Sequence, residues 1–126
     1  MALAGSTFGS QITHSFEAYE AMATAYSVVK LSSSDGMVAL NGSAGELCIG
    51  IIQQKAAANQ SVSVCLLGVS NAVCGAAVTK GAALQGDGSA RVIDATTADL
   101  IIGYALETGA AAGDIIPILV CPGGIY

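Results

Sequence analysis

Charge is scarce in this sequence, and tryptophan is absent. Only 10% of the 126 residues are charged, against about 25% in an ordinary soluble domain, while 53% are hydrophobic. The four basic residues, Lys30, Lys55, Lys80 and Arg91, are scattered among nine acidic ones, for a net charge of −5. Because no basic patch is present, we expect neither nucleic acid nor a membrane as a partner. A surface so poor in charge is typical of one covered by copies of itself or by another protein.

The residues that most catalytic sites need are also scarce. His14 is the only histidine, so a serine or cysteine nucleophile lacks an obvious base. The acidic residues mostly adjoin turns, and no glycine-rich phosphate-binding motif is present. The sequence therefore predicts a protein that is not an enzyme and that uses no cofactor.

The cysteines lack the clustering of a metal site. They are spaced by 17, 9 and 47 residues, without a C-x-x-C pair. The N-terminus also lacks the pattern of a signal peptide. We interpret all four as buried, reduced thiols and expect no metal, while leaving open whether any of them pair. They are Cys48, Cys65, Cys74 and Cys121.

Small and β-branched residues dominate what is present, and this composition favours short strands with tight turns. Turn signals such as Asp35-Gly36, Asn41-Gly42 and Gly86-Asp87-Gly88 separate the apolar runs. We therefore predict a mainly β fold, a small β-barrel or β-sandwich-like domain. The expected strands span residues 26–31, 36–41, 46–52, 61–67, 69–78, 90–94, 100–107 and 114–121.

Pro117 interrupts the last expected strand. Because proline has no N–H to donate, we expect it at an edge, at a bulge or facing solvent. An edge strand at this end would be a second candidate interface with another subunit.

An internal repeat is the most informative feature of the sequence. Several features recur in the same order about half a chain apart, and Lys30 and Lys80 lie just upstream of them. Two such halves would be marginal alone, so we expect them to pack into one pseudo-twofold core. We place the pseudo-repeats at residues 28–68 and 78–121. The features that recur, at offsets of 52, 53 and 54 residues, are Asp35-Gly36 with Asp87-Gly88, Ile49-Gly50 with Ile102-Gly103, and the alanines 56–58 with 110–112.

The first 26 residues differ from the rest, because they hold four of the six aromatic residues. We interpret residues 1–26 as an arm, either a short helix or extended, that docks on a neighbour through apolar anchors. The alternative is that this segment packs on its own domain. We expect residues 27–126 to fold without the arm. The candidate contact residues are Phe8, Ile12, Phe16, Tyr19, Met22 and Tyr26.

The second half of the sequence resembles a known family. Its motifs are Gly75-Ala-Ala-Val-Thr-Lys-Gly-Ala-Ala-Leu84, Ile102-Gly-Tyr-Ala-Leu-Glu107, Ala110-Ala-Ala-Gly-Asp114 and the closing strand Ile116-Pro-Ile-Leu-Val120. Their order is similar to that in the capsid decoration, or head cement, proteins of tailed bacteriophages. The resemblance covers residues 68–121 and extends more weakly over residues 28–67.

The resemblance implies a role that composition does not show. Such proteins are β-barrel-like, assemble in the host cytoplasm onto the outside of the head and stabilise its shell. The implied partners are the major capsid protein and further copies of the chain in a homotrimer. The alternative is a non-enzymatic β-barrel adaptor or ligand-binding module of another virion part, such as a fibre base, with a concave apolar pocket and a monomeric state.

Overall fold

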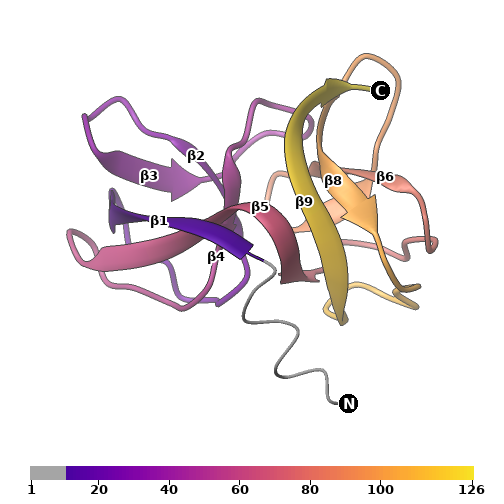
Figure 1. The fold of residues 1–126 in the computed structure, drawn as a ribbon, viewed down its shortest axis with the longest axis horizontal. Helices are drawn as coiled ribbons and strands as arrows, with labels where there is room; N and C mark the ends of the chain where they lie inside the picture. The colour runs from indigo at the N-terminus through magenta and orange to yellow at the C-terminus, as the bar shows by residue number, and fades with distance from the viewer. Residues whose placement is uncertain (1–10) are drawn as a thin grey trace.

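A computed structural model of the chain describes residues 11–126, and all regular structure in this range is β-strand (Figure 1). The strands form one continuous sheet in the order β1-β3-β2-β4-β5-β9-β8-β6-β7. The predicted mainly β fold is therefore confirmed, although the nine strands do not form a single closed barrel. The strands are β1 (Gln11–Ala18), β2 (Val28–Leu31), β3 (Met37–Leu40), β4 (Gly50–Ile52), β5 (Ser61–Val73), β6 (Ala83–Gly86), β7 (Val92–Asp94), β8 (Leu100–Ala105) and β9 (Ile115–Ile125).

The same ladder of strands occurs twice in the sheet. In the first ladder β2 pairs with β3 and β4, and β4 pairs with β5. In the second, β6 pairs with β7 and β8, and β8 pairs with β9. The registers correspond as well, because the pair Val28↔Ile51 of the first ladder has its equivalent in Ala83↔Tyr104 of the second.

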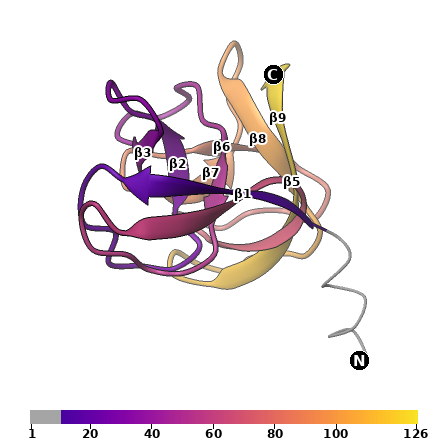
Figure 2. The ribbon, with the colours of Figure 1, turned by 60° about the vertical axis from the view of Figure 1, so that its left-hand side comes forward.

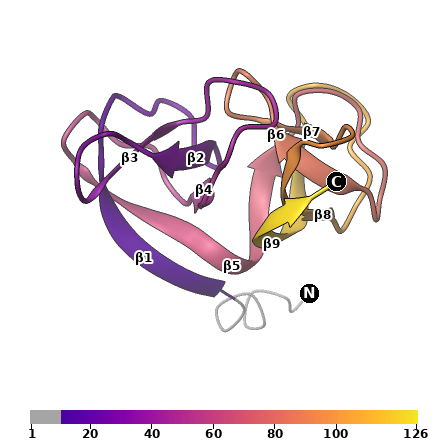
Figure 3. The same ribbon diagram turned by 90° about the horizontal axis from the view of Figure 1, so that it is seen from above.

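Strand β5 belongs to both ladders. Its first part pairs with β1, for example Thr13↔Cys65, and its second part pairs with β9 in the equivalent register, Val69↔Leu119 (Figure 2). The second part of β5 is thus the counterpart of β1. Strand β5 turns from one half into the other along its length (Figure 3), and Gly68, near its middle, has a φ of 116°, which suits glycine. We call residues 11–66 the first half and residues 67–125 the second half.

The duplication differs in its limits from the predicted one. Residues 11–26, predicted as part of an arm, form the first strand of the first half and the segment after it. The Asp-Gly pairs are not equivalent either: when the two ladders are compared by register, Gly36 corresponds to Ala90 and not to Gly88. Backbone geometry agrees, because positive φ recurs at matching turn positions. These positions are Tyr26 and Gly81, Gly36 and Ala90, and Asn59 and Gly113.

The strands also differ from the predicted ones in detail. Residues 61–67 and 69–78, expected as two strands, are largely one continuous strand because Gly68 bends the chain without ending the pairing. Strand β6 was not predicted, because Ala83–Gly86 lies in a run of glycine and alanine that reads as a loop.

Two apolar clusters form the core, and the second one joins the halves. The first cluster lies inside the first half and includes Val29, Ile52 and Val64. The second cluster fills the inside of the second half and also takes in Val28, Ile51 and Cys65 from the first half. Because side chains alternate along a strand, these last residues lie on the outer face of the first half. The second half therefore covers that outer face.

The repeated Ile-Gly pairs have a packing cause. A Cβ atom at Gly50 would overlap the backbone carbonyl of Cys65, and one at Gly103 would overlap that of Leu119. The two glycines hold equivalent places against equivalent strands. The Ile-Gly pair therefore recurs in the sequence because each half needs a glycine where two backbones approach closely.

Pro117 does not lie in an edge strand, so that alternative of the prediction, and the second candidate interface built on it, was wrong. Strand β9 lies between β5 and β8, and Pro117 pairs with Asn71. The carbonyl of Pro117 accepts a hydrogen bond from the N–H of Leu106, just beyond the end of β8. The proline nitrogen faces the same side, where the ladder with β8 is already ending, so the missing donor costs little.

Candidate docking surface

The candidate contact residues of β1 divide between the surface and the core. Strand β1 is held between β3 and β5, so these residues are not in a helix. Ile12 is 59% exposed and lies beside Leu67, which is also exposed. Tyr19, just after the strand, is 50% exposed. These three side chains are available to a partner protein.

The other candidates serve the fold. Phe16 packs against the core of the first half and contacts the ring of His14 edge-on, at 4.9 Å between centroids. Met22 is completely buried and its backbone pairs with that of Ala56, so the prediction that Met22 is a contact residue was wrong. Tyr26 packs against the second cluster. Phe8 lies outside the described residues.

A groove of about 320 Å³ lies where the halves meet, and its lining includes Tyr26, Asn71 and Pro117. Its polar groups are largely bonded to one another. The side-chain amide of Gln11 donates to the Oε1 atom of Gln53 at 3.1 Å and to the carbonyl of Val69 at 2.7 Å. The amide of Gln53 donates in turn to Ser70 Oγ at 2.9 Å. Five of its seven lining residues carry amide or hydroxyl groups, so the groove is only partly apolar.

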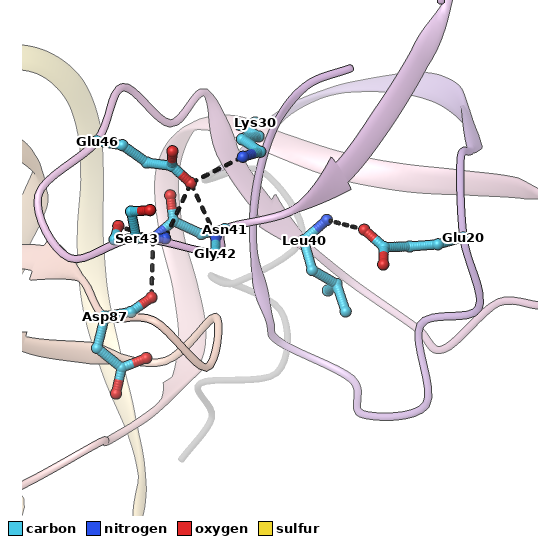
Figure 4. Close-up of polar contacts among 8 residues, drawn as sticks. All are labelled: Glu20, Lys30, Leu40, Asn41, Gly42, Ser43, Glu46 and Asp87. Carbon is cyan, nitrogen blue, oxygen red and sulfur yellow. Dashed lines mark hydrogen bonds and ion pairs between the residues drawn. The ribbon is translucent and has the colours of Figure 1, made fainter. Parts of the chain in front are cut away.

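A buried amide links the two halves (Figure 4). Asn41 is 1% exposed, and its Nδ2 atom donates to the carbonyls of Ser43, at 3.0 Å, and of Asp87, at 2.9 Å. Because Asp87 belongs to the turn after β6, this amide fixes that turn against the first half. Its Oδ1 atom is buried without a hydrogen-bond partner.

Glu46 holds the loop that contains this amide (Figure 4). Its carboxylate accepts hydrogen bonds from the backbone N–H groups of Gly42, at 2.8 Å, and Ser43, at 3.2 Å, and lies 3.0 Å from Lys30 Nζ. Burial on its own would raise the pKa of Glu46, but these hydrogen bonds and the charge of Lys30 outweigh it and lower the pKa.

A row of apolar side chains, two of them exposed, crosses the outer face of the second half. Four residues are direct neighbours across β5, β9, β8 and β6, and they point to the same side of the sheet. We call them the open row. Tyr104 is 41% and Leu119 38% exposed, and the residues at either end are half-buried. The members are Val69, Leu119, Tyr104 and Ala83.

The cysteines are placed as structural groups. All four are free, and Cys48, Cys65 and Cys74 are buried as predicted, while Cys121 is half-buried. Burial raises the pKa of the Cys48 thiol to about 11 and also raises the pKa values of Cys65 and Cys74. Within residues 11–126, no three histidine, cysteine or acidic side chains gather as metal ligands would.

No helix in the described part of the chain is long and apolar enough to cross a membrane.

Comparison with known proteins identifies the class. The model of the phage cement protein family matches residues 9–121, which span both halves of the sheet. The chain therefore belongs to the phage cement protein family, and the resemblance seen in the sequence is confirmed. Among solved structures, the base of head fiber gp8.5 from bacteriophage phi29 is similar, with a TM-score of 0.69 at 14% identity. The similarity covers 88% of this chain and 94% of that one, and it shows a shared fold. A search of the curated proteins found no match.

Sequence reasoning missed the open row. Tyr104 and Leu119 both lay in predicted strands, but the sequence does not show which strands are neighbours or which residues face one another. The repeat held a usable signal, because Tyr104 follows Gly103 as Ile51 follows Gly50. The exposed Tyr104 at the position equivalent to the buried Ile51 shows that the outer face is covered in the first half and exposed in the second.

Proposed function

We propose that this protein decorates the outside of a tailed-phage head and stabilises the shell of major capsid subunits, without catalysing a reaction. The family match over residues 9–121 supports this proposal most directly. The composition agrees, because a chain with only 10% charged residues suits many apolar contacts repeated over a shell. Modest affinities add up when contacts are multiplied in this way. The proposed location is the outer surface of the virion capsid, after assembly in the host cytoplasm.

The proposed capsid contact combines an arm with exposed residues at the start of the sheet. Residues 1–10 with Phe8 are the part of the predicted arm that precedes β1. Among the described residues, Ile12, Leu67 and Tyr19 expose large apolar side chains. Such side chains are typical anchors of protein interfaces. We further propose that the chain acts as a homotrimer, as the family resemblance implies.

The test is a binding assay with expanded, DNA-free heads of the phage that encodes the chain. Full-length protein should sediment with the heads at a fixed number of copies per capsid subunit. Removal of residues 1–10, and separately the substitution Ile12→Glu, should weaken binding at least about tenfold, as loss of an interface anchor does. Glu107→Gln, at an exposed polar position of the second half, serves as the matched control and should bind normally. Absence of binding by the full-length protein would refute the proposal.

The expected folding of residues 27–126 alone needs revision. Deleting residues 1–26 would remove strand β1, and with it the fully buried Ala18 and Met22. We therefore expect the chain without residues 1–26 to be largely unfolded and the chain without residues 1–10 to be folded. Circular dichroism and urea unfolding of both truncated forms distinguish these outcomes.

A second candidate function is the base of another virion part. The similarity in fold to the base of a head fiber favours it. A base would hold a further virion protein, whereas a cement protein raises the temperature at which the shell comes apart. Heads saturated with this protein and heated beside bare heads would separate the two functions.

A further inference from the structure

Each half of the chain has an outer face formed by equivalent strands, but only the outer face of the first half is covered by other residues within the range 11–126. In the first half, Val28, Ile51 and Cys65 are neighbours across three strands and are all completely buried. We call them the covered row. Their equivalents in the second half are Ala83, Tyr104 and Leu119 of the open row, in the same register.

Two parts of the second half bury the covered row: its apolar cluster packs on Ile51 and Cys65, and the end of β6 with the turn after it, residues 86–90, lies against Val28. The backbone N–H of Val28 donates to the carbonyl of Ala90 at 2.8 Å. The N–H of Gly45 donates to the carbonyl of Gly86 at 3.0 Å. With the bond from Asn41 to Asp87 described above, three hydrogen bonds join this segment to the first half.

The first half carries the equivalent segment, and nothing in the described part of the chain covers it. The ladders place Leu31 at the position of Gly86, because Leu31 pairs with Val38 as Gly86 pairs with Val92. Leu31 is 59% exposed, and residues 33–36 of the following turn are exposed as well. One chain therefore presents both an uncovered row and an unused covering segment, on different halves.

The side chains differ between the segment 86–90, which packs inside the chain, and the equivalent segment 31–36: where one residue is larger, its expected neighbours are smaller. Inside the chain, Gly86 has no side chain, and a Cβ there would lie 2.6 Å from Asn41 Nδ2 and 3.3 Å from Val28 Cγ1. At the equivalent positions, the large Leu31 replaces the glycine. The two residues that would surround it are both small. Ala83 is the equivalent of Val28. Ala95 is the equivalent of Asn41, because its N–H donates to the carbonyl of Ala83 as the N–H of Asn41 donates to the carbonyl of Val28. The exchange leaves room for Leu31 against the open row.

We propose that a second copy of this chain docks its residues 31–36 on the open row, next to Ala83, in the place that residues 86–90 take next to Val28 inside the chain. Such a contact is heterologous: each copy gives its first half to one neighbour and its second half to another. Contacts of this kind close into rings or continue as filaments. The contact deepens the proposed self-association and would hold the proposed homotrimer together.

Sedimentation velocity of the purified full-length chain tests this contact without capsids, so its failure and the failure of capsid binding are distinguishable. The wild type should be oligomeric, and Leu31→Glu and Tyr104→Glu should each weaken self-association more than about tenfold, because each buries a charge in an apolar contact. Both side chains are exposed, so circular dichroism and the urea midpoint should be unchanged. Ile125→Glu, at an exposed apolar position outside both segments, is the control and should associate like the wild type.

Mixing the two variants tests the head-to-tail arrangement. Leu31→Glu keeps an intact open row, and Tyr104→Glu keeps an intact segment 31–36, so an equal mixture should form dimers that neither variant forms alone. A monomeric wild type, a Leu31→Glu variant that associates normally or a mixture that stays monomeric would each overturn the proposal.

Discussion

The difference between the covered and open rows predicts unequal effects of equivalent substitutions. Ile51 and Tyr104 hold the same place in the two ladders, but Ile51 is 0% exposed and Tyr104 is 41% exposed. Truncating a fully buried isoleucine to alanine costs about 2–5 kcal/mol, because apolar contacts are lost and a cavity remains. Truncating a side chain as exposed as that of Tyr104 should cost about 1 kcal/mol or less in the monomer.

Urea unfolding followed by circular dichroism gives both values. With a slope of about 2 kcal/mol per molar urea, Ile51→Ala should lower the midpoint by about 1–2.5 M and Tyr104→Ala by less than about 0.5 M. The protein should be dilute enough to be monomeric, so that contacts between copies do not contribute. Ile52→Ala, inside the first half, is the positive control and should resemble Ile51→Ala. Equal shifts for Ile51→Ala and Tyr104→Ala would refute the inference that the second half covers only one of the two faces.

Three further predictions concern single residues. Gly103→Ala should lower the free energy of unfolding by about 1–3 kcal/mol, because its methyl group meets the backbone of the next strand, while Gly42→Ala, which has open space, should change little; urea midpoints of the two variants compare them. Glu46 has a lowered pKa in the folded chain, so its stabilising contribution is present above the pKa of the unfolded chain and is lost as the pH falls through the folded pKa. The difference in unfolding free energy between the wild type and Glu46→Gln should therefore shrink between about pH 7 and about pH 3, and a constant difference would contradict the role given to this carboxylate. A thiol reagent at about pH 8 should modify Cys121 first and Cys48 only after denaturation, since burial keeps the Cys48 thiol protonated, and rapid modification of Cys48 in the native chain would contradict its burial.

The sequence was enough to predict the β class and the duplication, because both depend on local signals. Turn residues and β-branched runs marked most of the strands, and the Ile-Gly pairs marked a close backbone contact present in both halves. The start of the repeat was hidden for a physical reason. In the second half its first strand is fused into β5, so that no turn separates it from the strand before.

Strand β1 was misread because its outward side chains are polar and its aromatic residues suggested a helical stripe. Phe16 is half-buried and Ala18 is buried, two residues apart as in a strand, but Ile12 and His14 at the start of β1 are exposed. A register shift between Ile12 and Thr13 breaks the alternation at this point. Which residues of the segment were exposed could therefore not be read from spacing alone, and Met22 was assigned to the surface in error.

Saturation of expanded, DNA-free phage heads with the purified protein tests the proposed function most directly, when bound copies are counted and the temperature of shell disruption is measured on the same sample. We predict a fixed number of copies per capsid subunit and a higher disruption temperature than for bare heads. No saturable binding, or saturable binding with an unchanged disruption temperature, would contradict the proposal that this chain cements the shell.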